Sequence, residues 1–160
     1  MINLKKIICW PPLLAGVGAA VTISILAYIT YQTELGLWLL ASFGATTVIV
    51  FGYHDNPFSQ PKNVFFSHLL TSVVGILFLY LLPLPNFILI PIAVGISVGL
   101  MILLNIAHPP AGANPIIIIM GSVSLDYIIS PIILGSIIIL IFAIILNRFI
   151  LRKNYPSKWT

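Results

Sequence analysis

The sequence predicts an all-α membrane protein with six transmembrane segments, arranged as a 3+3 inverted repeat in one domain over residues 1–160. Composition is the first reason. Apolar residues make up 60% of the chain and charged residues 6%, whereas soluble domains carry about 25% charged residues. The mean hydropathy is +1.16. Seven basic and three acidic residues cannot solvate the surface of a globule of this size, so we expect lipid as the solvent.

The first half of the chain holds three of the segments, at about 11–31, 35–53 and 64–82. The first follows two lysines and resembles a secretion signal. Its apolar run extends beyond a normal signal core, however, and no clear small-residue cleavage site ends it. Turn residues such as Asn56-Pro57 separate the segments, and the short joints predict antiparallel hairpins.

The second half holds the other three segments, at about 87–106, 109–123 and 127–149. Pro83-Leu84-Pro85-Asn86 precedes the first of them, and a serine-rich joint precedes the last. A membrane helix needs roughly 20 residues. The fifth segment is shorter, so it either takes in the stretch before it or forms a half-helix.

The basic residues predict the orientation. With six crossings they all fall on one side of the membrane, whereas Glu34 and Asp126 fall on the other. With five crossings, Arg148 and the basic residues after it would lie on the opposite side of the membrane from the others. The basic residues are Lys5, Lys6, Lys62, Arg148, Arg152, Lys153 and Lys158. Since cytoplasmic loops concentrate Lys and Arg, we expect a multi-pass cell-membrane protein with both termini in the cytoplasm, and the lack of an Arg- and Ser-rich transit segment favours a bacterial plasma membrane.

Several function classes are disfavoured. The basic residues form no continuous face, so nucleic-acid binding is not expected. Cys9 is the one cysteine and allows no disulfide within the chain; we interpret it as a small apolar filler, with a lipid-anchor or redox role as the alternative. We expect no cofactor, no bound metal and no enzymatic activity.

A weak internal duplication supports the repeat. Gly44-Ala45-Thr46-Thr47-Val48 resembles Gly112-Ala113-Asn114-Pro115-Ile116, and Pro12-x-x-x-Gly16 resembles Pro91-x-x-x-Gly95. These matches place segments one to three over four to six. Because three crossings are an odd number, the halves would be inverted, as in many secondary transporters whose site lies between the halves at the midplane. Chance similarity between apolar sequences is the alternative.

The stretch of residues 108–115 is the sharpest motif. Two consecutive prolines break an ordinary helix, and a broken helix in lipid survives only where protein or water satisfies its backbone. A helix that restarts here would aim free N–H groups at an anion. A tight loop with a packing glycine is the alternative. The residues are His108, Pro109, Pro110, Ala111, Gly112, Ala113, Asn114 and Pro115.

The second segment supplies the predicted partner element of that site. Its hydroxyls can donate to an anion, although small residues also serve ordinary helix packing. The predicted binding residues there are Ser42, Gly44, Ala45, Thr46 and Thr47. Since no Lys or Arg lies in the centre of any segment, we expect a small monovalent anion, held weakly. A phosphate or dicarboxylate would call for Arg.

Histidines are the candidates for a proton-linked step. His54 lies beside Asp55 and fits a cytoplasmic loop equally well. His68 lies about one turn into the third segment, where an interfacial histidine bonded to a loop carbonyl is the alternative. A third hypothesis, an intramembrane enzyme or metal site, requires both to converge with His108, although their spacing fits no zinc signature.

At these residues the sequence resembles the HPP family of integral membrane proteins, named for the motif His108-Pro109-Pro110. The resemblance spans roughly residues 8–159. Its other blocks are Ala41-Ser42-Phe43-Gly44-Ala45, residues 56–63 with His68 after them, and Asn154-Tyr155-Pro156-Ser157-Lys158-Trp159. Members in cyanobacteria and chloroplasts are associated with nitrite transport, which implies nitrite or a similar anion as the substrate. The usual family description gives four membrane helices, and the charge pattern is our reason to expect six.

These observations favour a transporter or channel for a small monovalent anion, with nitrite as first candidate and lipid as the other partner. A polar cleft between Gly44–Thr47 and Ala111–Asn114 is expected in that case. A structural or assembly subunit is the alternative, and it expects Gly44 and Gly112 in dry helix contacts. The isoleucine-rich stretch Ile132–Ile145 is compatible with a homo-oligomer face and equally with lipid.

Overall fold

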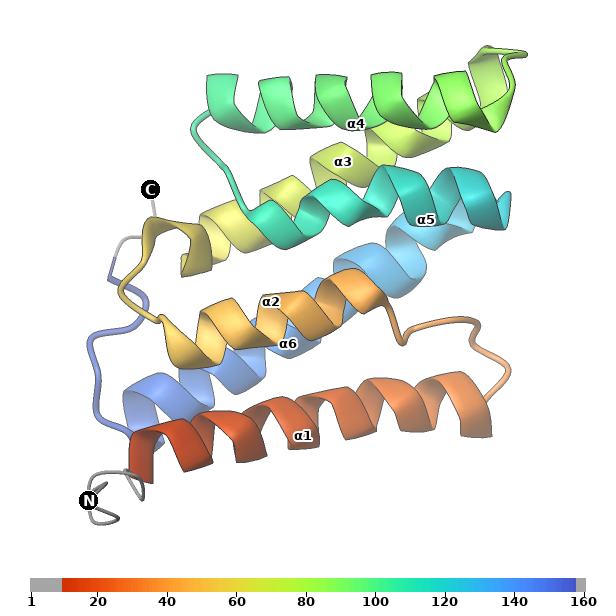
Figure 1. The fold of residues 1–160 in the computed structure, drawn as a ribbon. Helices are drawn as coiled ribbons and strands as arrows, with labels where there is room; N and C mark the ends of the chain where they lie inside the picture. Colours follow the sequence, from red (N-terminus) through yellow and green to blue (C-terminus); the bar gives the residue numbers. More distant parts are fainter. Residues whose placement is uncertain (1–9, 158–160) are drawn as a thin grey trace, which may run out of the picture.

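The structure, a computed structural model, describes residues 10–157. The expectations for Cys9, Lys5, Lys6 and Lys158 concern residues outside that range. Helical segments lie side by side and alternate in direction, and α1 begins at the same end of the bundle at which the last segment ends (Figure 1). The segments are α1 (Trp10–Gln32), α2 (Ala41–Gly52), η2 (Pro57–Ser59), α3 (Pro61–Leu81), α4 (Asn86–Leu103), η3 (Pro109–Ala113), α5 (Asn114–Gly121), η4 (Leu125–Ile128), η5 (Ile129–Ile133), α6 (Leu134–Ile144) and η6 (Ile145–Ile150).

Within residues 10–157, four helical stretches are long and apolar enough to cross a bilayer. They are Pro12–Gln32, Pro61–Leu81, Asn86–Leu103 and Leu125–Ile150. The second and fifth expected segments are shorter. α2 has 12 residues and extends about 18 Å, against about 30 Å of hydrocarbon. η3 and α5 follow each other without a gap over residues 109–121.

The expected segment 35–53 starts too early, because residues 35–40 are not helical. Gly36 has a positive φ of 95°, and Leu40 is extended. The Thr30 hydroxyl oxygen near the end of α1 accepts the N–H groups of Trp38 and Leu39, both at 2.9 Å. This side chain satisfies backbone donors that a longer helix would otherwise have satisfied.

The expected segment 87–106 ends early for a similar reason. α4 stops at Leu103, and Asn105 has a left-handed φ of 53°. The chain then runs outside any helix to His108 before η3 begins. This non-helical stretch lies at the end of the bundle, as the connection between the antiparallel α4 and α5 (Figure 1).

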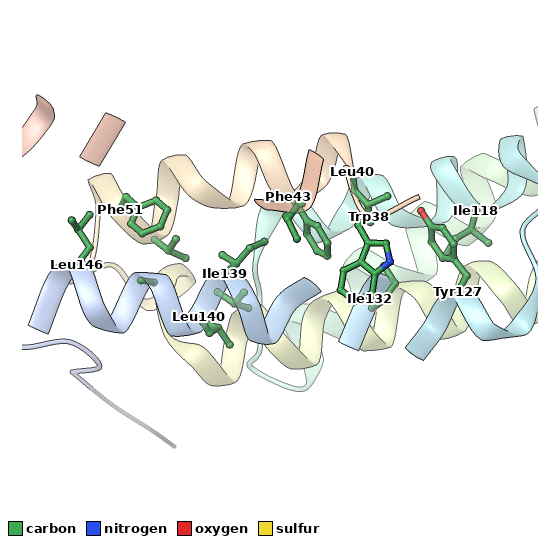
Figure 2. Packing of buried hydrophobic residues seen from close by; sticks show 14 of the residues in the cluster. Trp38, Leu40, Phe43, Phe51, Ile118, Tyr127, Ile132, Ile139, Leu140 and Leu146 are labelled. Carbon is green, nitrogen blue, oxygen red and sulfur yellow. The ribbon is translucent and has the colours of Figure 1, made fainter. Parts of the chain in front are cut away.

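Packing against α3 and α6 holds the other helices together. α3 packs on α4 and α5, whereas α6 packs on α1 and α2, and α3 and α6 contact each other. Phe43 and Phe51 of α2 lie over Ile139 and Leu146 of the last segment (Figure 2). A smaller apolar cluster joins α3, α4 and α5. Apolar side chains therefore pack against α3 on both of its sides.

Gly75 brings α3 close to the backbone of α5. A Cβ at Gly75 would lie 3.0 Å from Pro115 Cα and 3.3 Å from Ile118 Cβ. We expect Gly75→Val to lower the free energy of unfolding by about 1–3 kcal/mol, because overpacking would force α3 and α5 apart. Unfolding by SDS in mixed micelles measures the change. Gly99→Val on α4, where a Cβ meets nothing within 4 Å, is the control, and equal loss in both variants would contradict the prediction.

Candidate functional site: a buried polar cluster

Polar side chains from three helices and one connection meet in the interior. Thr46 belongs to α2, His68 to α3 and Asn114 to the first position of α5, whereas His108 belongs to the connection before η3. Each is at most 1% exposed. Thr46 Oγ1 lies 2.9 Å from Nε2 of His68 and 2.9 Å from Nε2 of His108. Asn114 Nδ2 lies 3.0 Å from His68 Nδ1. We call these four residues the polar cluster.

α3 contributes one polar face to this arrangement. Asn114 Nδ2 also lies 3.1 Å from Thr71 Oγ1 and 3.1 Å from Ser72 Oγ. With His68, these residues follow the three- and four-residue spacing of one helix face. An otherwise apolar helix therefore presents a stripe of polar groups to α5.

His108 is positioned by the stretch before it. The Ser67 hydroxyl donates to the Ile106 carbonyl, and Asn63 Nδ2 donates to the Ala107 carbonyl at 3.0 Å. Both donors belong to α3. This extended stretch is thus held along α3, which brings the His108 ring to Thr46.

The loop carbonyl of Phe58 determines the tautomers. It lies 2.7 Å from His108 Nδ1, and because a carbonyl only accepts, Nδ1 carries the hydrogen. In the neutral imidazole Nε2 is then bare and accepts the Thr46 hydroxyl. The Thr46 oxygen accepts from His68 Nε2–H, and His68 Nδ1 accepts from the Asn114 amide. Both histidines can therefore be neutral with every one of these contacts satisfied.

Two polar atoms beside the cluster have no partner in the described part of the chain. They are Ser42 Oγ and Asn114 Oδ1, both buried. Buried polar atoms are usually hydrogen-bonded, and an exception calls for an explanation such as a water or an ion. Hydrogen-bonding capacity is thus unused at Asn114 within the polar cluster and at Ser42, one helical turn before Thr46.

The other predicted binding residues surround the cluster. Thr47 is buried and its hydroxyl donates to the Gly44 carbonyl at 2.7 Å. Gly44 and Gly112 are partly exposed, and a Cβ on either would meet no heavy atom within 4 Å. The remaining members divide between the surface and the interior. Ala45 and Pro109 are exposed, Ala113 is partly exposed, and Pro110, Ala111 and Pro115 are buried.

The expectation of free N–H groups at the restart of the helix is wrong. Pro109 and Pro110 have no N–H, and the Ala111 N–H donates to the His108 carbonyl at 3.0 Å. The first positions of η3 therefore offer an anion no amide hydrogen. Donors in this region come from side chains instead.

The histidines separate into a pair and a single residue. His68 is in the interior rather than at the surface, seven residues or about 10 Å along α3 from Pro61, and its ring lies 5.2 Å from that of His108. His54 lies apart, with Nδ1 3.3 Å from Lys153 Nζ. Desolvation and the Lys153 charge lower the pKa of His54, and Asp55 raises it. The three histidines do not converge, and the described residues contain no group of three potential metal ligands.

The C-terminal stretch anchors the loop that holds His108. The Tyr155 hydroxyl donates to the Ser59 carbonyl at 2.8 Å, and the Ser157 N–H donates to Gln60 Oε1 at 2.9 Å. Sequence reasoning missed these contacts and the roles of Thr71 and Ser72. A polar stripe on one face of the apolar segment 64–82 was the signal that could have revealed the last two.

Two hollows lie near the site. One of about 430 Å³ lies between α1 and α2, and of the predicted binding residues Thr47 lines it. The other, of about 370 Å³, is lined by polar residues including Asp55, Lys62, Asn63 and Asn105. Because Asn63 also binds the Ala107 carbonyl, this second hollow opens beside the stretch that carries His108. We call it the vestibule.

Apolar helices of spanning length around a buried polar cluster define a multi-pass helical membrane protein. The chain belongs to the HPP family, because the family model described as HPP, transmembrane region, matches residues 6–156.

The chain is also similar to two transmembrane proteins of Dictyostelium discoideum. One is 35% identical over 147 residues, covering 86% of this chain and 52% of the relative. The other is 30% identical over 157 residues, covering 94% and 50%. The chain thus spans about half the length of these curated relatives. No solved structure matches the chain.

Proposed function

We propose that this chain moves a small monovalent anion across the membrane as a transporter or channel, with nitrite as the first candidate. The polar cluster is the observation that carries the proposal. Polar groups inside a membrane protein are costly and usually functional, and apolar residues would fill a purely structural interior at lower cost. Nitrite itself rests on the resemblance to family members associated with nitrite transport.

The chemistry of the cluster suits one negative charge. α2, α4, η3, α5 and α6 contain no charged residue. The hydroxyl, amide and imidazole N–H groups of the cluster are neutral and bond within the protein, and among the described residues beside it Ser42 Oγ is a donor without a partner. Binding by neutral donors is weak, which favours release, whereas a doubly charged anion would call for Arg.

The vestibule supplies an entry to this site. Lys62 and Asp55 both line it, so it holds one positive and one negative charge, and its polar lining lies beside the Phe58–His108 hydrogen bond. Lys62 lies in the first turn of α3, and Arg148 lies in η6, with Arg152 and Lys153 directly after it. The start of α3 and the end of the last segment lie at the same end of the bundle (Figure 1). Under the positive-inside rule that end faces the cytoplasm, so we propose a cell-membrane protein with both termini inside.

The paired halves support a 3+3 inverted repeat. Residues 41–53 and 109–121, a constant 68 positions apart, show matching burial at nearly every position. Thr46 corresponds to Asn114, and both bind His68. The contacts of α3 with α4 and α5 are mirrored by those of α6 with α1 and α2. On this basis we propose six crossings that rock as two halves around the polar cluster.

Reconstitution tests the proposal directly. Purified protein in liposomes is compared for flux of nitrite, nitrate, formate and chloride, with protein-free liposomes as the control for passive permeation. Saturable nitrite flux that requires the protein is expected. If no anion moves faster than in the control, the transport proposal is wrong and the structural or assembly subunit is favoured. That alternative expects Gly44 and Gly112 in helix contacts, and both are open within the described chain.

His68→Ala provides a second test in the same assay. Removing the ring takes away the group that joins Thr46 to Asn114, so the hydrogen-bond chain is cut. We expect the pH dependence of nitrite flux to change more than the concentration of half-saturation. An unchanged pH profile would exclude His68 from the mechanism.

A further inference from the structure

We propose that the site carries one proton with each anion and that His108 holds this proton, with the Thr46 hydroxyl switching between the two protonation states. The inference rests on the proposed anion transport and names its coupling ion. It differs from the sequence-based expectation, which placed the proton-linked step on His54 or His68.

Both ring nitrogens of His108 face oxygen atoms. Nδ1 lies 2.7 Å from the Phe58 carbonyl oxygen, and Nε2 lies 2.9 Å from Thr46 Oγ1. An imidazolium donates from both nitrogens and therefore needs an acceptor on each side. These acceptors are already in place around His108.

Thr46 can change its role because it has a second acceptor. The Ser42 carbonyl lies 2.9 Å from Thr46 Oγ1. When His108 is neutral, the hydroxyl donates to His108 Nε2. When His108 is protonated, the hydroxyl turns to the Ser42 carbonyl, and Oγ1 accepts from both histidines through its two lone pairs. Rotation of one hydrogen separates the two states, and no heavy atom has to move.

His68 lacks this arrangement. Its Nδ1 faces Asn114 Nδ2, which is a donor, and the same amide group lies 3.2 Å from the His68 carbonyl oxygen. That carbonyl keeps the amide in its present orientation, because the alternative would set two oxygens against each other. A second proton on His68 would therefore set its Nδ1–H against the Asn114 amide, which is also a donor. The geometry places the extra proton on His108.

Burial couples the proton to the anion. A lone imidazolium is unfavourable in a buried site, and His108 is fully buried. The elements packed against η3 offer no compensating carboxylate. α2, α4 and α5 have no titratable side chain, and α3 has Lys62, His68 and Tyr80. Asp55 and His54 lie in the loop near Phe58. Proton and anion together are neutral, so each increases the affinity of the site for the other.

The proton balance is simple. A hydronium ion in the water of the vestibule gives its proton to His108 Nε2 as the anion binds, so that one O–H bond of hydronium breaks, the Nε2–H bond forms and neutral water remains. On the other side the Nε2–H bond breaks and water takes up the proton as the anion leaves. Transport is then electroneutral. Flux should not respond to a potassium-diffusion potential, and a nitrite gradient should move protons in a ratio of one to one.

Liposomes loaded with a pH-sensitive dye test this coupling alongside nitrite flux, after subtraction of the protein-free control for nitrous acid permeation. Thr46→Val keeps the side-chain shape but removes the hydroxyl, and we expect it to reduce coupled flux at least about tenfold. Thr46→Ser should restore it. Thr22→Val is the matched control, because the Thr22 hydroxyl is also buried and donates to a carbonyl four residues earlier, at 2.8 Å.

Nitrogen NMR of histidine-labelled protein gives a readout that does not depend on flux or on the Thr46 variants. Nitrite should convert His108 from a neutral to a doubly protonated ring. Nitrite flux that responds to voltage, without a lumenal pH change and with His108 neutral, would overturn the coupling and leave anion transport standing. Coupled flux at the wild-type rate in Thr46→Val would overturn the switch. Absence of flux for every anion would remove both proposals.

Discussion

Replacing Asn114 with leucine is expected to lower the free energy of unfolding by about 1–3 kcal/mol and to abolish anion flux. Asn114 is 1% exposed, and its amide provides the donor to His68 Nδ1. Leucine is similar in size but leaves that nitrogen buried without a donor. The substitution also removes the hydrogen bonds between Asn114 of α5 and the Thr71 and Ser72 hydroxyls of α3.

Thermal unfolding in nanodiscs measures the stability change, and the liposome assay measures flux on the folded fraction. Ile116→Leu is the control, since Ile116 lies on the same helix with an exposed side chain. Wild-type stability and flux in Asn114→Leu would show that the polar cluster is neither a structural nor a functional feature of the interior.

Replacing Gly112 with phenylalanine is expected to reduce flux to below about one tenth while leaving the protein folded and inserted. A Cβ at Gly112 meets no heavy atom within 4 Å, so the new side chain should not displace the helices. It would instead fill the open space two residues before Asn114. A loss of flux without a loss of stability identifies that space as part of the route.

Gly95→Phe on α4 is the matched control, because a Cβ there also meets nothing within 4 Å and the residue lies outside the predicted site. Size-exclusion profiles and membrane yields should match among the wild type and both variants. If Gly112→Phe transports nitrite at the wild-type rate, the anion does not pass this glycine.

Much of the site could be predicted from sequence because it rests on unusual residues in apolar surroundings. Thr46, His108 and Asn114 stood out for that reason, and the structure brings all three to His68. The carbonyl groups of Phe58 and Ser42 could not be predicted. Every residue has a carbonyl, so only the path of the chain shows which one lies near a given side chain.

The helix ends, too, could be predicted from the sequence only in part. α1 and α3 lie close to their expected segments, because apolar composition marks the part of the chain that avoids water. α2 begins later than expected, since the Thr30 hydroxyl and the backbone of Trp38 and Leu39 meet only in the folded protein. A hydrogen bond over eight or nine residues leaves no mark on hydropathy.

Composition by itself determined the class of protein and most of the apolar segments, and the proline motif indicated the region of the candidate site. These properties belong to single residues or short stretches and depend on transfer between water and lipid. The tertiary structure alone decided which side chains meet, which nitrogen of His108 bears its hydrogen and why the helix restart offers no amide donors. Those outcomes depend on the positions of atoms to within a few tenths of an ångström, and packing between distant segments sets them.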